Sequence, residues 1–318
     1  MTWVTPRSSN MPWANLAGAS MREVFAAAAA WLDAGTPFAL ATLCALRAAR
    51  TAPIGTTIAV AADGRIIGNI GAGCYESEII EAAQETLADG VLRSLDINLD
   101  NDDELAGGTA CGAVMQLLIW RPHPSFVETA RDIALGERAA MLRIGTFEQV
   151  FPAKETLVLV GATSLAADLA AMGRRMDFNV IVVDPRPAFA TPERVPDAHA
   201  IVREWPDVYL PRSLSSHTSV VVLSHDPKFD MPALRCALRS DAPYIGLLGS
   251  RRAQSARRAA LRAEGFDEAA LARIHGPVGL DIGGTTTAET AVSILAEIVA
   301  QRSGRQGTPL LSVSGAIH

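Results

Sequence analysis

The sequence predicts an α/β protein in which a smaller, mixed α+β domain precedes a doubly wound parallel-sheet domain. Its 318 residues suit about two domains, each large enough to bury its own core. In the second half, short apolar runs alternate with helical stretches, which is typical of a buried parallel sheet with helices on both faces. In the first half, Asp63-Gly64 between two strand-like runs predicts an antiparallel hairpin. We therefore expect the second domain to be Rossmann-like.

The first domain is expected to begin with a helix and to continue as a sheet. Residues 21–34 have helical spacing and end before Gly35 and Pro37, a common stop signal. A second helix is predicted at 75–88. Strand-like runs lie at 38–47, 56–62, 65–69, 91–99 and 114–120.

The second domain is expected to alternate short strands with helices. Its predicted strands lie at 157–161, 180–184, 200–202, 219–224 and 244–248. The clearest predicted helices extend to about 176, from 251 to 262, and from 288 to 302. Pro122 and Pro124 mark a change of composition before this domain. The expected segments are an arm at 1–20, the N-terminal domain at 21–122, a connector with one helix and one strand at 123–153, the Rossmann-like domain at 154–304 and a tail at 305–318.

The composition argues against several functional classes. The net charge is −6 and no Lys/Arg cluster is interleaved with aromatic residues, so we expect no nucleic-acid binding. The arginine-rich stretch 251–262 is interpreted as a solvated helix face. We find neither a leader peptide nor an apolar segment long enough for a membrane. Four dispersed cysteines are typical of a reducing compartment, so we expect a cytoplasmic protein with Cys44 and Cys236 in its core.

Two glycine-framed cysteine loops, at 70–78 and 107–113, are the strongest indication of a binding site. Glycine lets the main chain approach a ligand closely. Cys74 precedes a predicted helix, whose free N–H groups and dipole would stabilise a thiolate. A soft thiolate suits a cofactor that contains a metal, sulfur or phosphate. Alternatively, Cys74 and Cys111 are inert small residues buried in tight turns.

The dinucleotide fingerprint after the first strand of the second domain is incomplete. The sequence from 161 to 166 is GATSLA, where G-x-G-x-x-G is expected. Gly161 can form the tight turn, but Thr163 would hinder the approach of a pyrophosphate. Asp184 stands at the end of the next strand, where a ribose-binding acid belongs. An NAD(P)-dependent oxidoreductase and a fold that has lost its nucleotide both remain possible at this point.

Three further segments could bind a ligand. His225 follows one strand and is either a ligand or base, or a structural histidine. Ser250 begins a helix after another strand and offers an anion site, with Arg251 as a bidentate donor. The stretch DIGGTTT at 281–287 is similar to the phosphate-binding turn of actin-like sugar kinases. One of its threonines could equally cap the last helix, with Glu289 in the first turn.

An ordered series of motifs resembles the XdhC/CoxI family over about residues 21–304. The motifs are GRIIGNIGAGCYE (64–76), TACG (109–112), VDPR (183–186), LSHD (223–226), APYIGLLGSR (242–251) and RIHGPVGLDIG (273–283). Members of this family are accessory factors for xanthine dehydrogenase and carbon monoxide dehydrogenase. This chain departs from their pattern at Ala113, where a glycine is usual, and at Thr163 and Ser164, where the turn usually resembles G-x-G-H.

The resemblance implies a molybdenum cofactor chaperone rather than a turnover enzyme. Such a protein would shelter the cofactor while a cysteine desulfurase adds the sulfido ligand, and would then deliver it to a molybdenum hydroxylase. We also expect a homodimer. Cys74 and Cys111 would face the metal. The full set of expected cofactor-binding residues is Gly71, Gly73, Cys74, Glu76, Cys111, Gly112, Gly161, Asp184, His225, Ser250 and Arg251. A non-catalytic scaffold that recruits the same partners is a further alternative.

Overall fold

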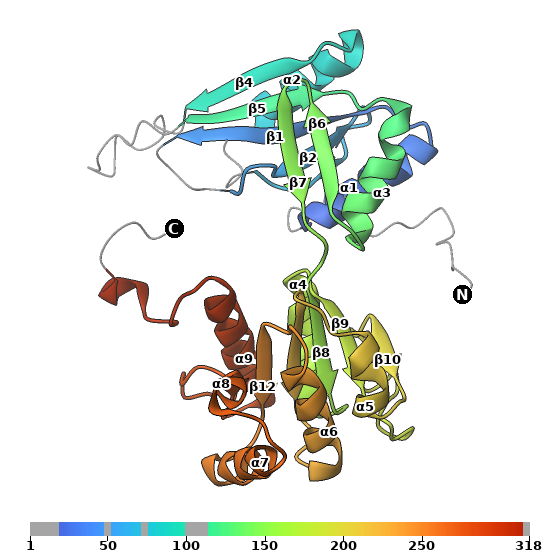
Figure 1. The fold of residues 1–318 in the computed structure, drawn as a ribbon. Coiled ribbons are helices and arrows are strands. Elements are labelled where there is room, and N and C mark those ends of the chain that lie inside the picture. The colour runs from blue at the N-terminus through green and yellow to red at the C-terminus, as the bar shows by residue number, and fades with distance from the viewer. Residues whose placement is uncertain (1–18, 48–51, 71–75, 99–113, 314–318) are drawn as a thin grey trace. The chain divides into compact units, whose positions relative to one another are not determined.

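The computed structural model describes residues 19–47, 52–70, 76–98 and 114–313 and divides the chain into two compact units, with the boundary between Ala153 and Lys154 (Figure 1). The elements of the first unit are α1 (Met21–Asp33), β1 (Phe38–Arg47), β2 (Thr57–Ala61), β3 (Ile66–Ile67), α2 (Glu76–Asp89), β4 (Arg93–Asn98), β5 (Val114–Trp120), α3 (Val127–Leu135), β6 (Ala140–Ile144) and β7 (Phe147–Phe151).

The first unit is built on an antiparallel five-stranded sheet with the order β3-β2-β1-β5-β4. Successive side chains of β1 point to opposite faces of the sheet. Phe38 and Leu40 pack with α1 and α3 on one face, whereas Ala39, Ala41 and Leu43 pack with α2 on the other. Both faces are therefore covered, which explains the nearly continuous apolar sequence of β1.

Residues 123–153, expected as a connector with one helix and one strand, form α3 and a two-stranded hairpin of β6 and β7. Both elements pack on the core of the first unit. The Phe25 ring of α1 lies 5.3 Å from Phe151 of β7 and 6.2 Å from Phe126 beside α3, with edge-to-face geometry in both pairs.

The second unit contains alternating strands and helices, as the sequence predicts. They are β8 (Thr156–Val160), α4 (Ser164–Arg175), β9 (Asn179–Val183), β10 (Ala200–Val202), α5 (Pro206–Tyr209), β11 (Thr218–Val222), α6 (Pro227–Leu238), β12 (Tyr244–Leu247), α7 (Arg251–Ala263), α8 (Glu268–Ala272), β13 (Ile274–His275) and α9 (Thr287–Arg302).

The sheet of the second unit is parallel throughout and has the order β10-β9-β8-β11-β12-β13. This is the doubly wound Rossmann order, in which the chain leaves the central strand first in one direction and then in the other. The α/β fold class predicted from the sequence is therefore confirmed.

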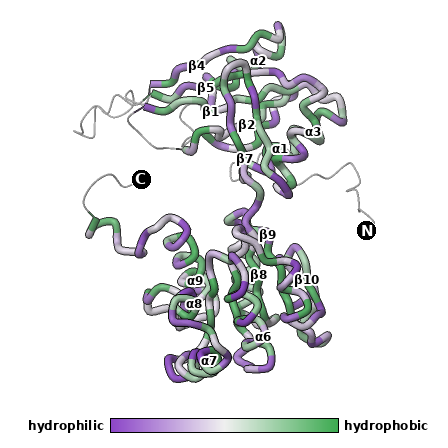
Figure 2. The backbone as a smooth tube through the Cα atoms, in the orientation of Figure 1, coloured by the Kyte–Doolittle hydropathy of each residue, from purple (hydrophilic) through white to green (hydrophobic). Residues whose placement is uncertain are grey.

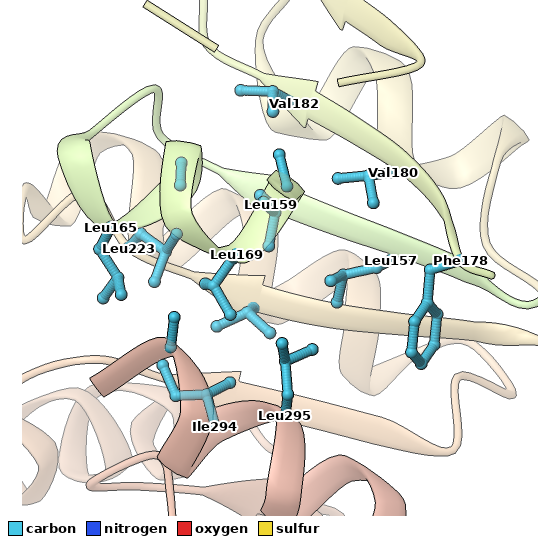
Figure 3. Packing of buried hydrophobic residues seen from close by; sticks show 14 of the residues in the cluster. Leu157, Leu159, Leu165, Leu169, Phe178, Val180, Val182, Leu223, Ile294 and Leu295 are labelled. Atoms are coloured by element: carbon cyan, nitrogen blue, oxygen red, sulfur yellow. The ribbon is translucent and has the colours of Figure 1, made fainter. Parts of the chain in front are cut away.

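Helices cover both faces of this sheet. Leu157 and Leu159 of β8 face α4 and α9, and Val158 and Val160 face the side covered by α6. Figure 3 shows the first of these layers, which includes Leu165, Leu169, Ile294 and Leu295. In Figure 2 the strands are mostly hydrophobic, whereas α7 is largely hydrophilic. Among the described residues, no helix combines the length and the apolar character that crossing a bilayer requires.

Candidate functional site

The loops at the carboxyl ends of the parallel strands form the candidate site, because open α/β sheets bind ligands at this edge, where the strand order reverses. The reversal occurs between β8 and β11. Gly161 follows β8 and has φ +110°. A Cβ at this position would lie 3.1 Å from both the N and the Cα of Ser224, which follows β11. Only glycine therefore allows the two loops to pack this closely.

Thr163 occupies the place of the second fingerprint glycine and serves as the N-cap of α4. Its hydroxyl accepts a hydrogen bond of 3.2 Å from the Ala166 N–H. The cap stabilises the start of the helix. The same side chain stands where a dinucleotide pyrophosphate would approach the main chain.

Asp184 lies at the end of β9, is almost completely buried, and accepts four hydrogen bonds. Its Oδ1 accepts from the N–H and Nε of Arg186 at 3.0 and 2.9 Å. Its Oδ2 accepts from Arg186 Nη2 at 2.7 Å and from the Ala162 N–H at 2.9 Å. A carboxylate offers about four acceptor positions, so all are used. Asp184 thus holds the β8 and β9 loops together, and a ribose could bind to it only by displacing one of these donors.

Asp184→Asn is expected to lower the free energy of unfolding by about 1–3 kcal/mol at neutral pH, because an amide leaves buried donors without acceptors. Burial on its own would raise the pKa of Asp184, but the hydrogen bonds from Arg186 and Ala162 outweigh it and lower that pKa. A depressed folded-state pKa stabilises the protein above the unfolded value of about 3.9, and this contribution is lost as the pH falls through the folded value.

Urea unfolding of the wild type and the variant at a series of pH values checks this. The difference in unfolding free energy should be constant above about pH 5 and shrink below about pH 4. A difference that grows on acidification would contradict the assignment.

A buried polar network lies beneath the loop that follows β11. The Ser224 hydroxyl donates to Asp230 Oδ1 at 2.5 Å, and Arg257 Nη2 donates to Asp230 Oδ2. Asp230 and Arg257 are both buried, and they join α6 to α7. Arg257 Nη2 also lies 3.4 Å from the carbonyl oxygen of His225. His225 has φ +60°, a left-handed conformation that is uncommon outside glycine, and its side chain is exposed. The ion pair therefore supports a strained, exposed histidine at the switch point.

The loop after β12 contacts the same arginine. A Cβ at Gly249 would lie 3.6 Å from Arg257 Nη1, so the guanidinium group lies beneath this loop as well. Ser250 is the N-cap of α7 and accepts a hydrogen bond of 3.3 Å from the Ala253 N–H. Arg251 is the first residue of α7 and is exposed. Arg257 thus links the loops that present His225 and Ser250.

The N-terminus of α9 is already occupied by a side chain of the protein. Thr286 is the N-cap, and Glu289 completes a capping box. The Glu289 carboxylate accepts from the N–H groups of Thr285 and Thr286 at 2.8 and 2.9 Å. These bonds lower the pKa of Glu289 to about 2. The N–H groups of Thr285 and Thr286 thus bind a carboxylate of the protein itself, and the capping alternative for residues 281–287 is confirmed, with Thr286 as the N-cap.

The two cysteine loops lie largely outside the described residues, and so do Gly71, Gly73, Cys74, Cys111 and Gly112. Glu76 is the first residue of α2, so this helix begins one residue later than the predicted start at residue 75. Cys44 and Cys236 are partly buried, and burial raises the pKa of both thiols. Within the described ranges, no group of three or more His, Cys, Asp or Glu side chains has an arrangement that could hold a metal.

The structure brings four of the expected residues to one edge of one sheet: Gly161, Asp184, His225 and Ser250. It also identifies residues that the sequence did not single out, namely Arg186, Asp230 and Arg257. The expectation that the arginines of 251–262 form a solvated face is wrong for Arg257, which is buried against Asp230. Helical spacing alone cannot show which arginine faces a buried carboxylate on another helix.

Comparison with known proteins agrees with this architecture. A family model described as the XdhC Rossmann domain matches residues 157–298, and one described as the XdhC and CoxI family matches residues 31–97. Among solved structures, a crystal structure described as a xanthine dehydrogenase from Bacillus halodurans has a TM-score of 0.76 and 21% identity. It covers 92% of this chain and 99% of its own, and it shows the same fold.

Three curated proteins are similar in sequence. The uncharacterized protein YqeB of Escherichia coli K12 is 26% identical over 292 residues, which are 92% of this chain and 48% of YqeB. A Bacillus subtilis 168 protein, named as a probable component of xanthine dehydrogenase, is 32% identical over 157 residues, 49% of this chain and 46% of that protein. The chain thus spans about half the length of these two relatives. The molybdenum cofactor insertion chaperone PaoD of E. coli K12 is 24% identical over 291 residues, 85% of each chain.

Proposed function

The chain belongs to the XdhC/CoxI family, and on this premise we propose that it is an accessory protein in the maturation of a molybdenum enzyme. The observation that supports this most strongly is the similarity to PaoD, named as a molybdenum cofactor insertion chaperone, over 85% of both chains. In this proposal the protein binds molybdenum cofactor in the cytoplasm, shelters it during sulfuration by a cysteine desulfurase, and delivers it to a molybdenum hydroxylase. It acts as a homodimer.

The residues proposed to bind the cofactor are considered for each unit separately. In the first unit, Cys74 and Cys111 supply thiolates for the metal. Cys74 lies two residues before the first residue of the 14-residue helix α2, and a position beside a helix N-terminus lowers the pKa of a thiol. In the second unit, the loops of Gly161, His225 and Ser250 supply main-chain N–H groups and polar side chains at the sheet edge. The cofactor itself supplies the molybdenum and its sulfur ligands.

The geometry of the second unit does not favour the alternative of an NAD(P)-dependent oxidoreductase. Thr163 stands where a fingerprint glycine would admit a pyrophosphate. All four acceptor positions of Asp184 are used within the protein. NAD(P)H should therefore bind weakly.

A transfer experiment tests the delivery role. The protein is loaded with molybdenum cofactor and mixed with a xanthine dehydrogenase that was purified without cofactor, together with a cysteine desulfurase and L-cysteine. We expect xanthine oxidation to appear faster and to a higher final level than with the same amount of free cofactor. Equal activation by free cofactor, with or without the protein, would contradict a role in protection and delivery.

A further inference from the structure

An aromatic and guanidinium cluster lies at the carboxyl-terminal edge of the second sheet and shares only Arg186 with the site described above. We call it the Trp205 shelf and define it by Arg186, Phe189, Trp205 and Phe229. The Arg186 Cζ lies 4.1 Å from the centre of the Phe189 ring and 5.1 Å from that of Phe229. The Trp205 ring centre lies 5.2 Å from that of Phe229. Phe229 is thus flanked by a guanidinium group and by an indole.

The four side chains come from three segments at one sheet edge. Arg186 and Phe189 follow β9, Trp205 follows β10, and Phe229 belongs to the first turn of α6 after β11. These loops lie at the carboxyl ends of β9, β10 and β11, the edge at which open α/β sheets bind ligands. The shelf is therefore next to the switch point where Gly161 meets Ser224.

Trp205 is the member of the shelf best placed to contact a ligand. It is 47% exposed, which is a large exposed fraction for a tryptophan, and Phe229 beside it is buried. Phe189 is contacted by the guanidinium groups of both Arg186 and Arg194, so its ring is less accessible to a ligand. The indole N–H of an exposed tryptophan also remains available as a donor.

Arg186 adds a fixed hydrogen-bond donor beside the aromatic surface. Its Nε and Nη2 are bound by Asp184, which holds the plane of the guanidinium group in place. Its Nη1 makes no hydrogen bond within the described part of the chain. Because Asp184 balances the positive charge, this Nη1 is better suited to a ring carbonyl or a single phosphate oxygen than to a polyanion.

We propose that the Trp205 shelf binds a flat, oxygen-bearing nitrogen heterocycle, which stacks on Trp205 and accepts a hydrogen bond from Arg186 Nη1. If the proposed function is right, two sources of this chemistry exist: the pterin of the cofactor, and the base of a nucleotide appended to it. Stacking on an exposed aromatic ring tolerates different heterocycles, because each presents a π-face.

Isothermal titration calorimetry of the cofactor-free protein with CMP, GMP, AMP and neopterin tests the proposal. At least one of these probes should bind saturably. Trp205→Ala should weaken that binding about fivefold or more, whereas Trp205→Phe should retain most of it. Val208→Ala is the matched control, because Val208 is exposed on α5 and outside the shelf. It should bind as the wild type does.

Tryptophan fluorescence of the wild type and of Trp205→Phe tests the same contact even if Trp205→Ala does not fold. Trp205 is the only tryptophan after residue 120. The probe that binds should quench emission in the wild type more than in Trp205→Phe. Binding of nucleotides alone would assign the shelf to an appended nucleotide, and binding of neopterin would assign it to the pterin.

The proposal is overturned if none of the four probes binds at millimolar concentration, or if a folded Trp205→Ala variant binds as tightly as the wild type. It is also overturned if heat of binding appears without quenching of Trp205. These titrations need no molybdenum. A failure of the four probes to bind therefore leaves the chaperone role untouched, because that role is tested by the cofactor content of the purified protein.

Discussion

Asp230→Asn is expected to lower the free energy of unfolding of the second unit by about 3–5 kcal/mol. The reason is that Asn removes the negative charge facing Arg257, and this arginine is buried between α6 and α7. A buried cation that has lost its carboxylate partner is costly. The Ser224 hydroxyl can still donate to the amide oxygen, so the loss arises mainly from the ion pair.

Urea unfolding followed by Trp205 emission measures this effect in the second unit. Glu264→Gln is the matched control, because Glu264 forms a partly exposed ion pair with Arg235 of α6. Exposed pairs contribute about 0–1 kcal/mol, so the control should unfold close to the wild type. A loss of less than about 1 kcal/mol for Asp230→Asn would show that the buried pair does not hold α6 and α7 together.

Cys74→Ser and Cys111→Ser are each expected to abolish most of the bound molybdenum and pterin while leaving the melting temperature close to that of the wild type. The expected reason is that a hydroxyl is a far poorer ligand than a thiolate for a soft metal centre. Cys44→Ser is the control. Cys44 lies in β1, its thiol donates to the Gln116 carbonyl at 3.2 Å, and it should keep full cofactor content.

Alkylation by iodoacetamide at neutral pH gives an independent readout for the same cysteines. Burial raises the pKa of Cys44 and Cys236, so both should contain little thiolate and react slowly. Cys74 should react first, and bound cofactor should protect it. If Cys74→Ser retains full cofactor occupancy, or if Cys74 reacts no faster than Cys44, the cysteine loops are not the binding site.

Much of the fold could be predicted from local patterns. The predicted bounds of the strands 38–47 and 114–120 match β1 and β5, because these strands are apolar runs between clear turn signals. The alternation of strands and helices after residue 156 predicted the parallel sheet. Residues 123–153 contain two strands, β6 and β7, where the sequence predicted one, although Ala140–Ile144 alternates buried and exposed residues as a half-buried strand does.

Less of the candidate site could be predicted, because its contacts join residues that are distant in sequence. Asp184 was recognised from its position at the end of a strand, yet only the structure shows that Arg186 and Ala162 use all its acceptor positions. The partner of Arg257 lies 27 residues away on another helix. Its burial depends on how α6 and α7 pack, and no sequence periodicity encodes that.

The cofactor content of the purified protein decides whether this chain binds molybdenum cofactor. The full chain is expressed in a molybdate-fed host and purified without added ligand. Bound pterin is then measured by the fluorescence of its oxidised form, and molybdenum by metal analysis. We expect pterin and molybdenum in near-equal amounts, with little nicotinamide nucleotide. Protein that contains tightly bound NAD(P)H, and neither pterin nor molybdenum, would contradict it.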